Sequence, residues 1–525
     1  MQIKDEVIIS DINNGKIHDR INNNNGADFY EIFVPLEKEV NKIIGFGMEY
    51  SLDDMFPVIK KITLSTMFGL LIVYISLLYS IYTTYKRDEK LVRLAYYDNL
   101  TGLPNTEFLM EKFEENSISN KDNKDNKAVL LIKCDNLNLI NLTFGYDYGN
   151  MVLKELGRRI KTLENRNIQL FKFTAEKFVL YINHYHDKED LLGIINKVND
   201  LFNQRFTING ISEHVAIKIG VVEYNSTDKS LDQLLKDATI ALKYVDINVA
   251  SNYRFFNESM AANVQREEII ERELREAISD EDTSKIYLLY QPIIDSKTDK
   301  IEGFEALARM NSEEFGLVSP VEFIDIAERK QLIIPFSKFI LRVACRFAAE
   351  LLKLGFNDIR VAVNISTIHF IRDDFVSTVL NIIEETGING RNLELELTET
   401  IMMDNFRIVK ERLKELRANE IQISLDDFGT GYSSLDRLSE LSVDSLKIDK
   451  CFIEDITDPN KNSLIPNGII SMAHGLGIKT VAEGVELQAQ KDYLLEHGCD
   501  KLQGYFISKP VCEEEAIMLI RENKN

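Results

Sequence analysis

The sequence predicts a multidomain α/β protein: a TIM-type (β/α)8 barrel at the C-terminus, a smaller α/β domain before it, and one transmembrane helix near the N-terminus. Three observations support this prediction. Eight strand candidates separated mostly by helical stretches follow residue 282, a second alternation of strands and helices occupies residues 98–255, and residues 62–85 contain no charge. Eight strand–helix units in about 240 residues match the size of a TIM-type barrel.

Composition narrows the class of ligand. The chain has 525 residues and a formal net charge of −22, which argues against a protein that coats a nucleic-acid polymer. An acidic protein can still bind a small phosphate ligand through metal cations or local arginines. The five cysteines are scattered, with no CxxC pair, so we expect free thiols in a reducing compartment and no disulfide or zinc site.

Residues 62–85 are expected to span a membrane. As a helix they reach about 36 Å, which exceeds a bilayer core of ~30 Å. A buried core helix is the alternative, but core helices rarely run this long without a charge. Lys60 and Lys61 precede the segment, and a larger basic group comprising Lys86, Arg87, Lys90 and Arg93 follows it. This asymmetry places the bulk of the chain in the cytoplasm, beneath the cytoplasmic (inner) membrane.

The flanking segments are interpreted as signalling elements. Residues 1–61 contain two strand candidates, 29–36 and 43–51, and look like the last hairpin of an extracytoplasmic sensor domain whose first part is missing. Residues 86–97 form a charged linker helix. Residues 256–281 form a connector helix, in which Ile270, Leu274 and Ile278 recur every four residues and predict one buried stripe.

The domain at 98–255 alternates strands with helices and is predicted to be α/β or α+β. Its strand candidates are 128–134, 169–174, 178–182 and 215–223.

The barrel strands carry an alternating pattern. They are predicted at 286–291, 301–309, 360–366, 393–399, 421–427, 444–449, 478–483 and 501–506. Period-two alternation directs the apolar residues outward to the helices and the polar residues inward, near the C-terminal strand ends where barrel active sites form. The polar residues expected to meet there are Glu305, Asn364, Glu396, Asp426, Lys447, Glu483 and Gln503.

Asp427 directly follows Asp426, and neighbours on a regular strand point to opposite faces. Both side chains reach the site only where the strand ends, and the glycines at 429 and 431 are interpreted as that end.

The expected cluster has a chemical consequence. Carboxylates crowded in one place raise each other's pKa, and divalent cations remove that cost. Oxygen ligands of this kind suit Mg²⁺ or Mn²⁺, and two such ions can promote displacement at a phosphodiester. Any one of these residues taken alone is equally consistent with a surface charge, but the whole set, phased inward on successive strands, predicts a metal site.

At these residues the chain resembles the EAL-domain family of cyclic di-GMP phosphodiesterases, over about residues 265–515. The matching motifs are Glu305-Ala306-Leu307 followed by Arg309, Asn364-Ile365-Ser366, Glu396-Leu397-Thr398-Glu399, Asp426-Asp427-Phe428-Gly429, Leu446-Lys447-Ile448-Asp449, Ala482-Glu483-Gly484-Val485-Glu486 and Gln503-Gly504-Tyr505. No catalytic position departs from the family pattern.

The resemblance implies a residue-by-residue assignment. Two Mg²⁺ or Mn²⁺ ions would be held by Glu305, Asn364, Glu396, Asp426, Asp427 and Glu483. Lys447 would hold the attacking water, Glu486 and Gln503 would support the site, and Arg309 and Gln291 would bind the substrate. Glu399 would anchor the loop 428–434, which in this family couples dimerisation to metal binding, and the product would be linear pGpG.

The preceding domain resembles the GGDEF family of diguanylate cyclases, from about residue 96 to 255. The entry motif Asp98-Asn99-Leu100-Thr101-Gly102-Leu103-Pro104-Asn105 is nearly intact, but the signature is Thr174-Ala175-Glu176-Lys177-Phe178, without its two glycines. Lys133 replaces the first metal-binding Asp, Asn141 matches a guanine contact, and Asn150 replaces the second. The resemblance therefore implies no cyclase activity. A scaffold and dimer element, or an allosteric GTP sensor, remain as the two interpretations.

Three functions are consistent with these two domains. An active phosphodiesterase is favoured, since a non-catalytic cyclic di-GMP receptor typically loses a metal ligand or the loop at 426–434, and neither has happened here. A bifunctional enzyme is disfavoured by Lys133 and Lys177. A homodimer through both domains is expected from the family.

Overall fold

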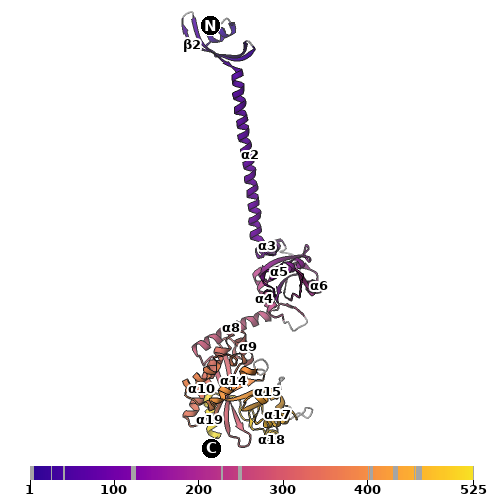
Figure 1. Ribbon diagram of the computed structural model, residues 1–525, viewed down its shortest axis with the longest axis vertical. Helices are drawn as coiled ribbons and strands as arrows, with labels where there is room; N and C mark the ends of the chain where they lie inside the picture. Colours follow the sequence, from indigo (N-terminus) through magenta and orange to yellow (C-terminus); the bar gives the residue numbers. More distant parts are fainter. Residues whose placement is uncertain are drawn as a thin grey trace. The chain divides into compact units, whose positions relative to one another are not determined.

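The computed structural model describes residues 5–523 apart from residues 25, 40–41, 120–125, 226–228, 246–250, 400, 402–405, 430–434, 455 and 457–463. The chain divides into two compact units, Met1–Asn257 and Glu258–Asn525 (Figure 1).

The N-terminal segment is a small antiparallel sheet with a helix. It contains α1 (Glu6–Asn13), β1 (His18–Asn24), β2 (Ala27–Glu39) and β3 (Lys42–Ser51), in the order β1-β2-β3. The strands expected at 29–36 and 43–51 lie within β2 and β3. The sequence analysis missed α1 and β1. Strand β1 reads HDRINNN, a polar and asparagine-rich run without the alternation that marks a half-buried strand.

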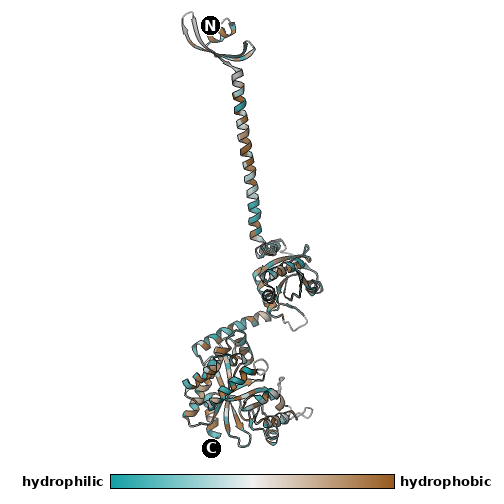
Figure 2. Ribbon diagram, in the orientation of Figure 1, coloured by the Kyte–Doolittle hydropathy of each residue, from teal (hydrophilic) through white to brown (hydrophobic). Residues whose placement is uncertain are grey.

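Helix α2 (Leu52–Tyr96) follows without a break. Its stretch Phe56–Tyr96 is long and apolar enough to cross a membrane, and none of its most apolar window is buried among the described residues. Figure 2 shows hydrophobic residues along the middle of this helix and hydrophilic residues toward its C-terminal end. The expected span and the expected linker helix at 86–97 are therefore parts of one continuous helix.

The rest of the first unit is an α/β domain with a five-stranded sheet in the order β10-β9-β4-β6-β5. The strands are β4 (Asn126–Cys134), β5 (Ile168–Thr174), β6 (Lys177–Tyr185), β9 (Ile217–Tyr224) and β10 (Tyr253–Phe255), and a separate hairpin pairs β7 (Phe206–Ile208) with β8 (Ile211–Glu213). The four predicted strands are all present. The helices are α3 (Thr106–Ser119), α4 (Leu137–Phe144), α5 (Tyr146–Lys161), α6 (Lys188–Asn203) and α7 (Leu231–Lys243).

Alternation along β4 divides this domain into two cores. Leu130 and Ile132 pack with residues of α5 and α6, whereas Val129 and Leu131 pack with residues of α3 and α7. The sheet is therefore covered by helices on both faces.

The second unit is a closed barrel (Figure 1). Its strands are β11 (Ile286–Asp295), β12 (Ile301–Ser312), β14 (Arg360–Asn364), β15 (Leu393–Thr398), β16 (Gln422–Phe428), β17 (Ser445–Ile448), β18 (Lys479–Ala482) and β19 (Lys501–Leu502). Strands β12 and β14 to β19 pair in parallel, and a short strand β13 (Gly316–Val318) extends β12. The predicted TIM-type barrel is confirmed.

One detail of the expected barrel is wrong. Strand β11 runs antiparallel to both of its neighbours, β12 and β19, and so closes the barrel in the reverse direction. Only residues 296–300 separate β11 from β12. A parallel crossover needs about a dozen residues or more, so this short connection forces a hairpin. The Asp295 carboxylate accepts hydrogen bonds from the backbone of Lys297 and Thr298 and stabilises the turn.

Helices surround the barrel. They are α9 (Pro320–Arg329), α10 (Ile333–Lys353), α11 (Thr367–Phe370), α12 (Phe375–Thr386), α14 (Phe406–Ala418), α15 (Leu435–Glu440), α16 (Lys450–Glu454), α17 (Leu464–Gly475), α18 (Gln488–Glu496) and α19 (Glu513–Asn523), with a 3-10 turn at Gly390–Asn392. The connector is α8 (Glu258–Asp280), which packs Ile270 and Leu274 into the barrel unit's core. Ile278, the third residue of the expected stripe, is only partly buried.

Candidate active site

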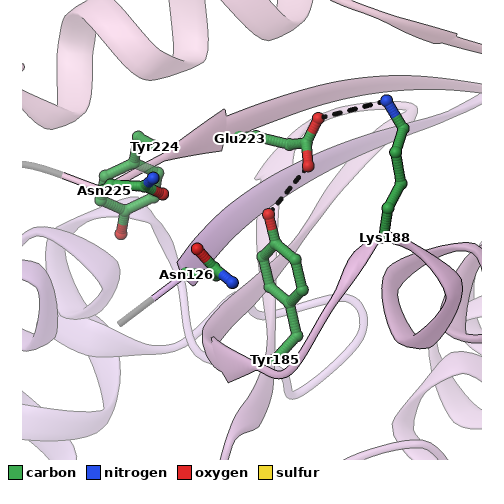
Figure 3. A pocket seen from close by; sticks show the side chains of 6 residues that line it. All are labelled: Asn126, Tyr185, Lys188, Glu223, Tyr224 and Asn225. Atoms are coloured by element: carbon green, nitrogen blue, oxygen red, sulfur yellow. Dashed lines mark hydrogen bonds and ion pairs between the residues drawn. The ribbon is translucent and has the colours of Figure 1, made fainter. Parts of the chain in front are cut away.

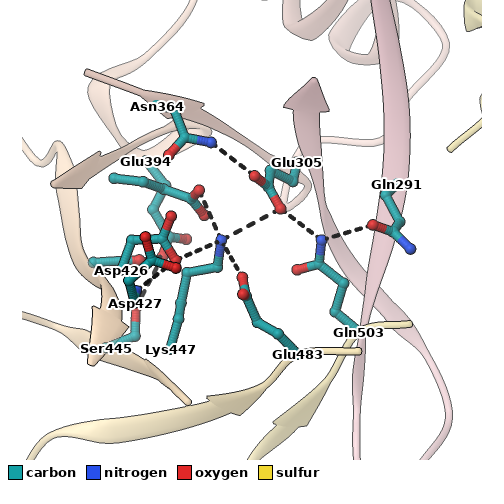
Figure 4. Close-up of polar contacts among 12 residues, drawn as sticks. Gln291, Glu305, Asn364, Glu394, Asp426, Asp427, Ser445, Lys447, Glu483 and Gln503 are labelled. Carbon is teal, nitrogen blue, oxygen red and sulfur yellow. Dashed lines mark hydrogen bonds and ion pairs between the residues drawn. The ribbon is translucent and has the colours of Figure 1, made fainter. Parts of the chain in front are cut away.

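Polar side chains gather at the C-terminal ends of the parallel barrel strands (Figure 4). Each comes from a different strand or from the residue that follows it: Glu305 from β12, Asn364 from β14, Glu396 from β15, Asp426 from β16, Lys447 from β17, Glu483 after β18 and Gln503 after β19. The backbone register aligns neighbouring strands, for example Asn364 opposite Glu396. The residues that period-two alternation placed inward therefore lie together.

Lys447 is at the centre of this cluster and is only 1% exposed. Its Nζ lies within ion-pair distance of one carboxylate oxygen on each of four residues. The distances are 2.6 Å to Glu483, 2.8 Å to Glu396, 3.3 Å to Glu305 and 3.4 Å to Asp426. A single buried cation therefore holds four acidic side chains from four strands in one place.

A chain of amides positions Glu305. Asn364 Nδ2 donates to Glu305 Oε1 at 2.7 Å, and Gln503 Nε2 donates to Glu305 Oε2 at 2.6 Å. Gln503 Nε2 also lies 3.1 Å from Gln291 Oε1, and Gln291 Nε2 donates to the Ser508 carbonyl. Glu305 is 5% exposed, so its position is determined by these partners and by Lys447.

Asp427 reaches the site through an irregularity inside the strand. The sequence analysis expected β16 to end here, but the strand continues to Phe428, and its register with β17 shifts between Leu425 and Phe428. Asp427 has a φ of 55°, a left-handed conformation that Asp and Asn tolerate better than other side chains. One carboxylate oxygen from each of Asp426, Asp427 and Glu483 lies within 4.8 Å of the others.

The crowding of these carboxyl groups shifts their pKa values. Burial and the charge of Glu305 raise the pKa of Glu396 well above its usual range, and burial, aided by Asp426, raises the pKa of Glu483 to about 8. Burial would raise the pKa of Glu305 as well, but Lys447 and the amide hydrogen bonds outweigh it and lower that pKa. Desolvation and the charges of Asp426 and Asp449 raise the pKa of Asp427 to about 6.

The pKa of Lys447 is raised as well. Burial alone would lower its pKa, but the surrounding carboxylates outweigh burial and raise that pKa well above the usual lysine value. The ammonium therefore stays protonated at neutral pH.

The donor set fits a pair of divalent cations. Five carboxylates face one ammonium, which leaves a formal charge of −4 when all are ionised. Two divalent cations would cancel that charge. Glu396 Oε1 is buried and accepts no hydrogen bond from any described residue, so it has an oxygen lone pair to offer. All-oxygen donors of this kind suit Mg²⁺ or Mn²⁺.

Three residues assigned to the site by resemblance lie outside the cluster. Arg309 is on the same face of β12 as Glu305, and its Nη1 donates to the Ala308 carbonyl at 2.9 Å. Glu486 forms an exposed ion pair with Lys450 at 2.8 Å. Glu399 is buried and its Oε2 accepts from the Gly429 backbone N–H at 3.1 Å, while residues 430–434 of the expected loop lie outside the described part of the chain.

Sequence reasoning assigned no role to four residues that contact the site or lie beneath it. Asp449 acts on the Asp427 carboxyl, and its position two residues after Lys447 was the available signal. Glu394, Ser424 and Ser445 form a hydrogen-bonded layer below the cluster, each two residues before a site residue on its own strand. Their inward phase was visible, but their contacts were not.

Two family models match the sequence of the chain. The model of the EAL domain matches residues 271–510, and the model described as "Diguanylate cyclase, GGDEF domain" matches residues 95–246. Together the two matches cover most of the chain.

The chain is a tandem GGDEF–EAL protein.

Relatives of this GGDEF–EAL protein include two from Pseudomonas aeruginosa. The "Bifunctional diguanylate cyclase/cyclic di-GMP phosphodiesterase MucR" is 30% identical over 433 residues, which is 82% of this chain and 62% of that protein. The "Cyclic di-GMP phosphodiesterase NbdA" is 32% identical over 419 residues, which is 80% of this chain and 53% of that protein. The chain therefore spans less than two thirds of the length of either relative.

A solved structure described as "PaMucR Phosphodiesterase, c-di-GMP complex" is 34% identical to the EAL domain. The match covers 47% of this chain and 99% of that one, with a TM-score of 0.45.

In the GGDEF domain, the degenerate positions form their own ion-pair network. Lys133 Nζ lies 3.5 Å from Glu176 Oε1 and 3.6 Å from Asp135 Oδ1, and Lys218 Nζ lies 3.3 Å from Asp135 Oδ2. Lys133 is directly opposite Lys177 on β6 and Lys218 on β9. Three lysines therefore lie in a row across the sheet, where two carboxylates offset the repulsion expected between like charges.

A further lysine supports the signature turn. Lys172 is buried and donates to the carbonyl oxygens of Thr174, Ala175 and Lys177, and burial lowers its pKa to about 8. Asn141 lies in α4, where its amide packs against Gly149, and Asn150 follows in α5 as an exposed residue.

A polar hollow of about 450 Å³ in the same domain is separate from the signature (Figure 3). It is lined by Asn126, Tyr185, Lys188, Glu223, Tyr224 and Asn225. Tyr185 donates to Glu223 at 2.8 Å, and Lys188 lies 4.0 Å from the same carboxylate. Asn126 begins β4 and Lys133 lies near its end, so the hollow and the degenerate cyclase positions are at opposite ends of the sheet.

Proposed function

We propose that the EAL domain hydrolyses cyclic di-GMP to linear pGpG with two divalent cations, Mg²⁺ or Mn²⁺. The observation that carries this proposal is the cluster of five carboxylates around the buried Lys447 at the mouth of the barrel. The names of the relatives support the substrate, since both NbdA and MucR are described as cyclic di-GMP phosphodiesterases.

The cations would be held by Glu305, Asn364, Glu396, Asp426, Asp427 and Glu483. When bound, they would activate a water nucleophile and stabilise the attacking and leaving oxygens of the phosphodiester. Asp427 and Glu305 belong to the catalytic group in this proposal because they would hold the cations that act on the phosphodiester.

The chain's own side chains would orient the reactants. Lys447 remains protonated, so it cannot accept a proton from water; it would hold and polarise the attacking water as a hydrogen-bond donor. Arg309 has a planar guanidinium that suits a substrate phosphate. Gln291 and Gln503 would seat the substrate through the amide chain that they form. Glu486 would support the site from the loop after β18.

The GGDEF domain is proposed to lack cyclase activity. The Lys133 ammonium lies between Asp135 and Glu176, where it competes with any divalent cation for the two carboxylates. Side chains at Thr174 and Ala175 also replace the glycines that would allow a close approach to nucleotide phosphates. The domain would act as a scaffold, or as a GTP sensor in which the lysines contact phosphates directly.

Helix α2 is proposed to anchor the protein as a single pass in the cytoplasmic (inner) membrane. The basic group that follows the apolar stretch would place both catalytic-type domains in the cytoplasm and residues 1–61 outside, as part of a sensor. A signal would reach the EAL domain through a homodimer formed by the GGDEF and EAL domains.

Glu399 provides a test of coupling between the loop and the metals. Replacing Glu399 with alanine removes the acceptor for the Gly429 N–H, which lies two residues beyond Asp427. We expect the Mn²⁺ affinity to fall by about tenfold or more, the range seen when groups that orient metal ligands are removed. Glu399→Gln retains an acceptor oxygen and is the matched control. Wild-type Mn²⁺ affinity and turnover in Glu399→Ala would contradict the coupling.

The proposed activity is tested with the full-length protein purified in detergent. It is incubated with cyclic di-GMP and either Mg²⁺ or Mn²⁺, with and without GTP, and pGpG and cyclic di-GMP are followed by chromatography. We expect pGpG to form, chelator to abolish it, and GTP alone to give no cyclic di-GMP. A change in pGpG rate with GTP would identify the sensor role. Binding of cyclic di-GMP without cleavage at any metal concentration would instead identify a receptor and overturn the proposal.

A further inference from the structure

A polar layer lies inside the barrel directly beneath the carboxylate cluster. Glu394 on β15 is 5% exposed, and its Oε1 accepts hydrogen bonds from Ser424 Oγ on β16 and from Ser445 Oγ on β17, each at 2.9 Å (Figure 4). Ser424 is 0% exposed and Ser445 is 3% exposed. The interior of a TIM-type barrel is usually packed with branched apolar side chains, so a layer of hydrogen-bonded polar side chains is unusual there.

The layer is in phase with the site above it. Glu394 is two residues before Glu396, Ser424 is two before Asp426, and Ser445 is two before Lys447. Because side chains on a strand repeat with period two, each layer residue shares its face with the site residue on the same strand. One carboxylate oxygen therefore joins the three adjacent strands that carry three carboxylates of the cluster and its central lysine.

We propose that Glu394 is a positioning residue for the divalent-cation site. Through the two serine hydroxyls it fixes the positions of β15, β16 and β17 relative to one another along the barrel axis. These positions in turn determine the separation of Glu396, Asp426 and Lys447. This inference rests on the proposed two-cation site, and it assigns Glu394 no contact with substrate or metal. Ser424 and Ser445 lie opposite each other in the strand register, so a shift of either strand would break one hydrogen bond.

Glu394 acts on the metal site through the geometry of the strands more than through its charge. A metal site tolerates only small ligand displacements, and groups that orient the ligands typically contribute about 10- to 100-fold to metal affinity. An apolar side chain at 394 would leave both hydroxyls buried without this acceptor, and small shifts of β16 and β17 could then satisfy them elsewhere. Glutamine is isosteric and keeps an acceptor oxygen for both serines.

The test measures Mn²⁺ binding by isothermal titration calorimetry on the full-length protein without nucleotide, together with the unfolding temperature in chelator. Glu394→Leu is expected to lower Mn²⁺ affinity at least tenfold, whereas Glu394→Gln is expected to stay within about threefold of wild type. Thr480→Val is the matched control: it removes a buried hydroxyl that bonds to Asp500, on the outer face of β18. It should lower the unfolding temperature but not the Mn²⁺ affinity.

A triple variant separates positioning from simple stability. Glu394→Leu combined with Ser424→Ala and Ser445→Ala leaves no unpaired hydroxyl, so its unfolding temperature should return toward wild type. Its Mn²⁺ affinity should remain at least tenfold lower, because no side-chain hydrogen bond from residue 394 then links β15 to β16 and β17. Recovery of affinity together with stability would overturn the proposal, as would wild-type affinity in Glu394→Leu. No Mn²⁺ binding by the wild-type protein would overturn the two-cation site itself, whereas Mn²⁺ binding without hydrolysis would overturn only the proposed activity.

Discussion

Replacing Asp427 with asparagine is expected to abolish hydrolysis of cyclic di-GMP while leaving the fold intact. The change removes one negative ligand from the group formed with Asp426 and Glu483. We expect a loss in kcat on the order of 10³-fold or more, as for other residues that act as part of one catalytic unit. Asparagine tolerates the left-handed φ of 55° at this position, so the irregularity in β16 should persist.

The measurement is pGpG formation at saturating Mn²⁺, with the unfolding temperature as a check on the fold. Asp299→Asn is the matched control, because Asp299 also has a positive φ, of 54°, but lies in the β11–β12 turn, where it pairs with Lys491. It should hydrolyse the substrate at the wild-type rate. If Asp427→Asn keeps more than about a tenth of the wild-type kcat, Asp427 is not an essential ligand.

The second large effect is expected from replacing Lys447 with methionine. Removing the ammonium leaves four carboxylates close together without their cation, of which Glu305 and Glu396 are buried. Breaking a buried ion pair by deleting one partner typically costs about 3–5 kcal/mol, so the metal-free protein should lose roughly this much free energy of unfolding. Divalent cations should restore much of the stability, because they supply the missing positive charge. Turnover should fall at least 100-fold even then, since no donor orients the attacking water.

This destabilisation should depend on pH. The pKa of Glu483 is about 8 in the folded metal-free protein, above the ordinary glutamate value, so its contribution to stability is present at low pH and is lost as pH rises toward 8. Deleting Lys447 removes a charge that lowers this pKa, so the carboxyl would be harder still to ionise. We therefore expect Lys447→Met to lower the unfolding temperature more at pH 8 than at pH 5.

The control for this experiment is Lys450→Met. Lys450 pairs with Glu486 and Glu454 at the surface, where ion pairs contribute about 0–1 kcal/mol. Its unfolding temperature should be close to wild type and should not depend on divalent cations. Equal, metal-independent losses in the two lysine variants would show that Lys447 does not act as a stand-in for the cations.

Much of the site was predictable because strand phase is a local property. Alternation along each strand was enough to place Glu305, Asn364, Glu396 and Asp426 on the inner face, and their position near the strand ends placed them at one mouth. The resemblance then added roles for residues such as Arg309 and Glu486, whose contacts the structure locates outside the cluster. Phase says which way a side chain points, but it does not say which other side chain it meets.

The sequence by itself determined the domain order, the apolar helix, the eight strands that close the barrel, four of the five strands of the GGDEF-domain sheet and the inward face of the barrel, because each depends on composition and periodicity within a short window. Tertiary structure alone decided the features that depend on neighbours distant in sequence. These include the antiparallel closure of the barrel by β11 and the register shift that turns the Asp427 side chain to the same site as that of Asp426. They also include the layer in which Glu394 accepts hydrogen bonds from two serines. It also placed the Lys133 ammonium between two carboxylates. The physical reason is that pairing across strands is set by how the whole sheet closes, which no local pattern encodes.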